Sequence, residues 1–129
     1  MPHVHIDYSA NLEERVDMAE LCEVIRQTAA SIDALPMPGI RVRATRVDHY
    51  AIADGDPKHA FIDLSLRLRA GRAPNTKADA IARIFEALKS YLAPVIEQQS
   101  IALSAEIRDI DAELSPKFST IRDHLEDIS

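Results

Sequence analysis

Residues 60–69 read Ala-Phe-Ile-Asp-Leu-Ser-Leu-Arg-Leu-Arg, and this stretch decides the fold. Its apolar side chains occupy every second position, which is typical of a strand with one buried face. Residues 70–74 read Ala-Gly-Arg-Ala-Pro, a composition that favours a turn. Apolar residues then recur with the period of a helix. The sequence therefore predicts a strand, a turn and a helix in this order.

The helix after this turn is predicted to be the longest in the chain, with Asn75 or Thr76 as its cap. Pro94 predicts a kink or an end, because proline cannot donate the backbone hydrogen bond of a helix interior. A second alternating stretch follows at Ile101, Leu103, Ala105 and Ile107. The second half of the chain therefore reads as strand, helix, strand.

The first half repeats this order less clearly. A strand is expected over residues 2–8, and Asp17 with Glu20 has the spacing of a capping box at the start of a helix. A turn over 36–39 precedes another strand, in which the alternation slips near residues 45–47 and indicates a bulge or bend. The chain is thus predicted to be one domain, 1–129, with an approximate internal repeat of 2–49 and 60–110. A C-terminal extension, 111–129, is expected to form a short helix after Ser115-Pro116.

Two strand-helix-strand units predict two pairs of parallel strands. The expected fold class is α/β, in the form of an α+β two-layer sandwich with a four-stranded sheet and two helices on one face. The other face, with residues such as Phe61, Ser65 and Ser104, is expected to be too apolar for solvent and to form a subunit interface.

Composition narrows the class of protein. The chain has 129 residues, of which 47% are apolar and 28% charged, the balance of a soluble globular protein. Its formal net charge of -6 argues against a nucleic-acid partner. The sequence contains no apolar run long enough to span a membrane, and its N-terminus lacks the features of a secretory signal, so a cytoplasmic location is expected.

Pro2 is the candidate catalytic residue. Removal of Met1 would leave a secondary amine at the N-terminus, and such an amine is a base when it is neutral. Burial and nearby arginines would both disfavour the ammonium form and bring its pKa toward neutrality. A base that titrates near the working pH suits proton transfer. A proline at position 2 without any catalytic role is the alternative.

Arg41 and Arg72 are the candidate substrate-binding residues. Each follows a glycine closely in a turn at a strand end, where ligands commonly meet an open sheet. An arginine can bind a carboxylate through two parallel hydrogen bonds. Exposed arginines on a polar face are the alternative.

Metal binding and other chemistries are not favoured. His3 and His5 lack an obvious third ligand, and turn chemistry accounts for Asp54, Asp56 and His59. We therefore predict no metal and no organic cofactor. No nucleotide-binding loop, dinucleotide fingerprint or Ser-His-Asp arrangement is recognisable.

With these residues in view, nearly the whole chain resembles the 5-carboxymethyl-2-hydroxymuconate isomerase family of the tautomerase superfamily. The order and spacing of several short matches carry the resemblance. They are Met1-Pro2-His3, Gly39-Ile40-Arg41-Val42-Arg43, Ala53-Asp54-Gly55, Ala60-Phe61, Ala70-Gly71-Arg72 and Ala102-Leu103-Ser104-Ala105-Glu106-Ile107.

The resemblance implies an enzyme that interconverts keto and enol groups or transposes a carbon–carbon double bond. It implies Pro2 as general base and acid, Arg41 and Arg72 as ligands of a dicarboxylate or tricarboxylate substrate, and a homotrimer whose sheets form a central barrel. It also implies a place in the bacterial degradation of homoprotocatechuate, an aromatic compound. Two alternatives stay open: a tautomerase acting on another unsaturated or aryl 2-keto acid, and a non-catalytic trimer that binds a small acid.

Overall fold

The computed structural model describes residues 1–126. Its single four-stranded sheet has the order β2-β1-β3-β4. The strands are β1 (His3–Ser9), β2 (Arg41–Val47), β3 (Ala60–Arg69) and β4 (Ile101–Ile110). β1 pairs with β2 in parallel, β3 pairs with β4 in parallel, and the central β1 and β3 are antiparallel. The predicted fold class, with two β-α-β units and two parallel pairs, is confirmed.

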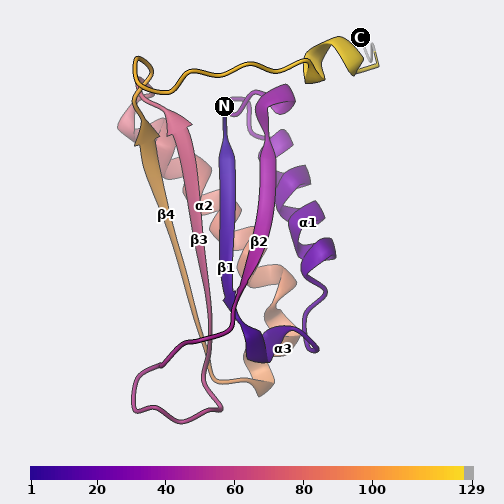
Figure 1. Ribbon diagram of the computed structural model, residues 1–129, viewed down its shortest axis with the longest axis vertical. Coiled ribbons are helices and arrows are strands. Elements are labelled where there is room, and N and C mark those ends of the chain that lie inside the picture. The colour runs from indigo at the N-terminus through magenta and orange to yellow at the C-terminus, as the bar shows by residue number, and fades with distance from the viewer. Residues whose placement is uncertain (127–129) are drawn as a thin grey trace.

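Helices α1 (Met18–Ala30) and α2 (Pro74–Tyr91) cover one face of the sheet, and the other face is open (Figure 1). The core lies between the two layers. Burial of one such aliphatic side chain stabilises the fold by roughly 1.5–3 kcal/mol. The strands contribute alternate residues to it, including Val4, Ile6, Ile62, Leu64, Leu66 and Leu68, and the helices contribute Leu21, Ile25, Ala29, Ala80, Ile84 and Leu88.

The start of α1 was predicted correctly from the local sequence, and the start of α2 was not. Asp17 caps α1, and its carboxylate accepts a hydrogen bond of 3.0 Å from the Glu20 N–H, as predicted. The prediction that Asn75 or Thr76 caps α2 is wrong, because α2 begins at Pro74 with Ala73 as its N-cap. Proline suits the first helical turn, since its fixed φ matches the helix and it has no N–H to satisfy.

Pro94 interrupts the second helical segment as predicted. α2 ends at Tyr91, and the short helix α3 (Ala93–Gln98) begins after Leu92, with Pro94 in its first turn. None of the helices within residues 1–126 is both long and apolar enough to cross a membrane.

The predicted bulge in β2 is wrong. The pairing of β1 with β2 runs without interruption from His3 opposite Arg41 to Ser9 opposite Val47. The slip in the pattern arises because Arg46 stands opposite the buried Tyr8, on the side of the helices. β2 is an edge strand, and Arg46 is exposed there and forms a salt bridge of 2.8 Å with Asp48. A polar residue at the end of an edge strand therefore explains the pattern.

The open face of the sheet is more charged than predicted. The pairing places four basic residues in one row across all four strands: Arg41, His3, Arg67 and Arg108. This row lies at the end of the sheet where the N-terminus lies, and Asp7 and Asp63 lie nearer the other end. Phe61 lies on the same face, where it pairs with Ala102 and its ring packs edge-on against Tyr50, so the face carries apolar groups beside this basic row.

The segment after β4 is extended, and the helix predicted from Ser115-Pro116 does not form. Within residues 111–126, only a 3-10 turn, η3 (Ile121–His124), appears, and it contacts a second turn, η2 (Met37–Gly39). A short helix needs packing of its apolar side to be stable, but Phe118 is 88% exposed. Figure 1 shows this segment crossing the end of the sheet next to the N-terminus. Residues 127–129 of the predicted extension lie outside the described residues.

Candidate functional site

Pro2 is buried at the start of β1 and is held there by β2. Its carbonyl accepts a hydrogen bond of 3.1 Å from the Arg41 N–H. Gly39 lies directly against it. A Cβ at Gly39 would be 3.2 Å from Cδ of Pro2 and 3.3 Å from Cα of Met1, which is tighter than ordinary van der Waals contact. The absence of a side chain at Gly39 therefore lets the N-terminal residues sit against the η2 turn.

Arg41 turns its guanidinium toward the N-terminal residue. Its Nη1 donates to Sδ of Met1 at 3.2 Å and to the Gly39 carbonyl at 3.3 Å. A thioether is a weak acceptor. Met1 therefore occupies a position at Arg41 where a carboxylate could bind more strongly.

Arg72 is fixed by two backbone carbonyls. Its Nε donates to the Ala34 carbonyl at 2.9 Å, and its Nη1 donates to the Arg69 carbonyl at 3.0 Å. The side chain is half-buried in this position. Because neutral carbonyls leave the positive charge uncompensated, Arg72 is oriented and still able to bind an anion.

A cavity of about 420 Å³ lies at this end of the sheet, beside the N-terminal residue and the η2 turn. Its lining includes Met1 and Arg72, the η2 turn and the extended C-terminal segment. The structure thus brings Pro2, Arg41 and Arg72 to one end of the sheet, but within residues 1–126 Arg72 alone of the three lines the cavity. The segment that closes the cavity carries Lys117 and Arg122, which sequence reasoning missed.

The terminal amine at this site is held in an environment that disfavours its charged form. Burial lowers the pKa of the Met1 α-amino group, and the positive charges of Lys117, Arg72, Arg69 and Arg41 lower it further. Each effect destabilises the ammonium form. An amine placed here is therefore a better base near neutral pH than a solvated one.

His3 and His5 have different environments and no shared ligand. Burial, then the charges of Arg67, Arg41 and Arg43, lower the pKa of His3, whose buried Nδ1 has no hydrogen-bond partner within residues 1–126. His5 Nε2 lies 3.1 Å from Thr45 Oγ1 and 3.2 Å from an Asp7 oxygen. In the part of the chain that the structure describes, no group of three His, Cys, Asp or Glu side chains could hold a metal ion.

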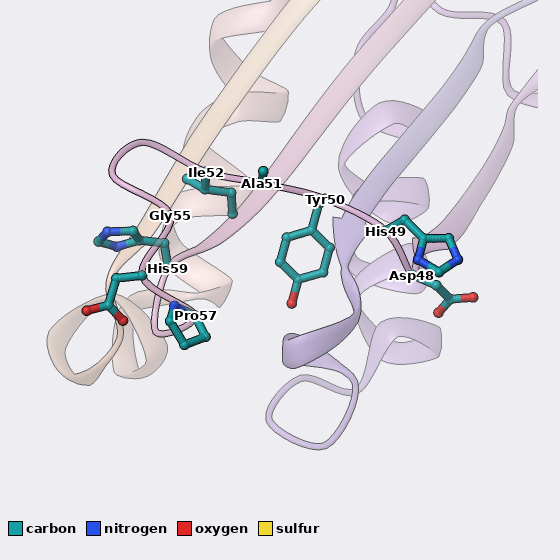
Figure 2. Close-up of a pocket in the computed structure, with 9 residues that line it drawn as sticks. Asp48, His49, Tyr50, Ala51, Ile52, Gly55, Pro57 and His59 are labelled. Atoms are coloured by element: carbon teal, nitrogen blue, oxygen red, sulfur yellow. The ribbon is translucent and has the colours of Figure 1, made fainter.

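A second cavity of about 410 Å³ lies in the loop between β2 and β3, which Figure 1 places at the far end of the sheet from the N-terminus. Figure 2 shows its lining, which extends from Asp48 and His49 through Tyr50 to Pro57 and His59. None of the predicted site residues lines this cavity.

His59 in this loop lies between Asp54 of the same loop and Ser100 just before β4. The sequence did not reveal this Ser-His-Asp chain. His59 Nδ1 lies 2.6 Å from Ser100 Oγ, and His59 Nε2 lies 2.7 Å from an Asp54 oxygen. Asp54 also accepts a hydrogen bond from the Asp56 N–H, as its predicted turn role requires. Backbone donation from Asp56, followed by the hydrogen bond with His59, lowers the pKa of Asp54. The arrangement ties the loop to the start of β4.

Comparison with known proteins decides the family. The family model described as 5-carboxymethyl-2-hydroxymuconate isomerase matches residues 2–125. The chain belongs to the 5-carboxymethyl-2-hydroxymuconate isomerase family. The match covers both β-α-β units and most of the C-terminal segment, so the resemblance found in the sequence is confirmed.

Relatives of this isomerase family agree in sequence and in structure. The chain is 31% identical over 121 residues to the Escherichia coli 5-carboxymethyl-2-hydroxymuconate Delta-isomerase, covering 94% of this chain and 96% of that one. The crystal structure of a 5-carboxymethyl-2-hydroxymuconate delta-isomerase has a TM-score of 0.89 and 28% identity, covering 100% and 95% of the two chains.

A third relative is a 5-carboxymethyl-2-hydroxymuconate isomerase from Deinococcus radiodurans R1. Its crystal structure has a TM-score of 0.87 and 33% identity, covering 95% of this chain and 92% of that one. The predicted enzyme class is therefore confirmed, and the chain is an isomerase of this family.

Proposed function

We propose that this isomerase, once Met1 is removed, converts the enol 5-carboxymethyl-2-hydroxymuconate to its 2-oxo isomer with the Pro2 amine as base. The observation that carries the proposal is the position of the N-terminus, where a buried Pro2 lies against Gly39 beside Arg41 and Arg72. The relatives that match along nearly the full chain are named for this substrate.

The proposed reaction is a proton transfer across a conjugated system. Neutral Pro2 takes the proton from the 2-hydroxy group, and a dienolate forms. Arg41 and Arg72 bind carboxylates of the substrate and stabilise the charge that develops at oxygen. The protonated proline then returns the proton at C5, which gives the unsaturated 2-oxo product and restores the neutral amine.

Removal of Met1 has two effects in this proposal. It converts the Pro2 nitrogen from an amide, which is not basic, into a secondary amine. It also vacates the position in which Sδ of Met1 contacts Nη1 of Arg41 at 3.2 Å. The base and one of the two arginines therefore become available in the same processing step.

Ultraviolet absorbance of the substrate provides the test. Processed wild-type protein is expected to accelerate ketonisation strongly, and protein that retains Met1 is expected to lack most of the acceleration, because its Pro2 nitrogen is an amide. A wild-type rate equal to that in buffer would contradict the proposed substrate. Activity confined to other unsaturated or aryl 2-keto acids would instead favour the broader tautomerase alternative, and binding of small acids without turnover would favour the non-catalytic one.

We also propose that the protein is a homotrimer. The open face of the sheet lacks a covering layer, and Leu114 and Phe118 are 81% and 88% exposed on the C-terminal segment. Burying these side chains between subunits would remove apolar area from water. Light scattering after size-exclusion chromatography is expected to give three times the chain mass, and a monomer would contradict the proposal. Homoprotocatechuate degradation and a cytoplasmic location remain predictions.

A further inference from the structure

The cavity at the N-terminus has a rim of basic side chains that the proposed reaction does not use. Arg69 stands at the end of β3, and Lys117 and Arg122 come from the extended C-terminal segment. All three side chains are exposed, whereas Arg41 and Arg72 are half-buried. Arg72 lines the cavity, and Arg41 reaches it through its contact with Met1. The positive charges at this end therefore form an inner pair, Arg41 and Arg72, and an outer group, Arg69, Lys117 and Arg122.

The outer group lacks acidic partners. Among residues 1–126, none of Arg69, Lys117 and Arg122 forms a salt bridge, although the chain carries six more acidic than basic residues. Within residues 1–126, Asp123 is the one carboxylate in the cavity lining, and Arg72 adds a fourth cation to it. Like charges held together repel one another, so an anion that binds between them is favoured.

The substrate of the proposed function has three carboxylates, because a muconate has two and its carboxymethyl group adds another. Two half-buried arginines suit two of them. The pendant carboxymethyl group extends from the conjugated chain and would reach the rim of the cavity. A third carboxylate at this rim would be attracted to the cations there, because opposite charges a few ångströms apart interact favourably.

We propose that Lys117, Arg122 and Arg69 bind the third carboxylate and make the site selective for tricarboxylates over dicarboxylates of the same length. This inference rests on the proposed function for its natural substrate. It assigns the C-terminal segment a role in substrate recognition, because two of the three cations belong to it. Phe118, from the same segment, also lines the cavity and places an apolar side chain beside the bound molecule.

Binding of two unreactive acids tests the inference without turnover. Tricarballylate is glutarate with one additional carboxylate, so the pair isolates the third charge. By calorimetry at low ionic strength, processed wild type is expected to bind tricarballylate about tenfold more tightly than glutarate, the size of one charge-assisted hydrogen bond. The double variant Lys117→Gln/Arg122→Gln is expected to lose most of this preference.

Lys89→Gln is the matched control. Lys89 is exposed in the last turn of α2, forms no salt bridge within residues 1–126 and is absent from the cavity lining. It changes the net charge as Lys117→Gln does and is expected to keep the tenfold preference. Circular dichroism would establish that the double variant is folded.

Turnover separates this inference from the proposed function. The ratio of kcat/KM for 5-carboxymethyl-2-hydroxymuconate over 2-hydroxymuconate, which lacks the third carboxylate, is expected to fall about tenfold in the double variant. Equal binding of tricarballylate and glutarate by wild type would overturn the inference, even in an active enzyme. Preferential binding of tricarballylate without turnover of either muconate would contradict the proposed function and leave the tricarboxylate site standing.

Discussion

The two ends of the sheet differ in how their charged side chains are paired. At the end with the loop between β2 and β3, acids lie next to bases: Arg46 with Asp48 at 2.8 Å, and His59 with Asp54 at 2.7 Å. At the N-terminal end, Arg108 pairs with Glu106 and Lys77 with Asp109 along β4. Around the cavity at this end, however, Arg41, Arg72 and Lys117 have no salt-bridge partner within residues 1–126.

This difference in charge pairing supports the proposed ligand site at the N-terminal end. Charges paired within the protein stabilise the loop locally and leave little for another molecule to bind. The positive charge of unpaired cations around a buried amine is compensated only when an anion binds. Both ends have cavities of similar volume, about 420 and 410 Å³, so charge distinguishes them where size does not.

The largest expected effect comes from Pro2. Unprocessed protein, in which Met1 keeps the Pro2 nitrogen an amide, should have a kcat/KM about 10²–10⁴-fold lower than that of the processed protein, the usual contribution of a general base. Pro57→Ala is the control, because Pro57 lines the cavity at the other end and its substitution should change kcat/KM by less than about twofold. Absorbance assays with 5-carboxymethyl-2-hydroxymuconate measure both. Equal losses in the unprocessed protein and in Pro57→Ala would remove the distinction between the ends.

Arg72 should have the next largest effect. Arg72→Ala is expected to lower kcat/KM by about 10²-fold, because a cation oriented by two carbonyls is lost from the site. Arg46→Ala serves as control, since Arg46 is paired with Asp48 at the other end and should change kcat/KM by less than about twofold. An Arg72→Ala enzyme with unchanged kcat/KM would show that Arg72 does not bind the substrate.

Two glycines should separate activity from stability. Gly39→Ala would press on Pro2 and Met1, so in the processed enzyme we expect kcat to fall about tenfold through displacement of the amine. Gly55→Ala meets no atom within 4 Å but has a φ of +87°, so it should cost about 1 kcal/mol of stability and leave kcat unchanged. Steady-state kinetics and urea unfolding test both. A Gly39→Ala enzyme with wild-type kcat would contradict the assigned role of the close contact.

The smallest expected effect is a shift in the pH profile. The amine is active when neutral, so kcat/KM should fall as the pH drops through its pKa. Lys117 is among the charges that lower the pKa of the Met1 α-amino group, and it should act in the same direction on the Pro2 amine that replaces it. Lys117→Gln should therefore raise the pKa of that amine and move the acid limb to higher pH. Profiles of kcat/KM for wild type, Lys117→Gln and Lys89→Gln provide the measurement. A shift of equal size in Lys89→Gln would point to net charge as the cause.

Local features of the structure were predictable because they depend on near neighbours in sequence. The alternation from Ala60 to Leu68 gave β3, and the spacing of Asp17 and Glu20 gave the start of α1. The prolines and glycine of residues 36–39 predicted the η2 turn that precedes Arg41. Two misreadings, the cap of α2 and the bulge in β2, came from patterns that permit two interpretations.

The remaining parts of the site depend on contacts between distant residues. Lys117 and Met1 lie near opposite ends of the chain and line the same cavity, and no local pattern indicates this. The Ala34 carbonyl that anchors Arg72 is 38 residues away in sequence, and Ser100 is 41 residues from His59. The path of the C-terminal segment was missed for the same reason, since Pro116 and Phe118 suggested a helix that has nothing to pack against.

The antiparallel pairing of β1 with β3 relates the two β-α-β units by an approximate twofold rotation. Under this rotation, Pro2 before β1 corresponds to His59 before β3, at opposite ends of the sheet. Two separate chains of half the length would each carry a free amine at these positions. One continuous chain has a peptide bond at the position before β3, so joining the halves leaves a single terminal amine, the one before β1. The position before β3 is then free to differ, and His59 there belongs to a hydrogen-bonded loop. The backbone is therefore more symmetric than the arrangement of its reactive groups.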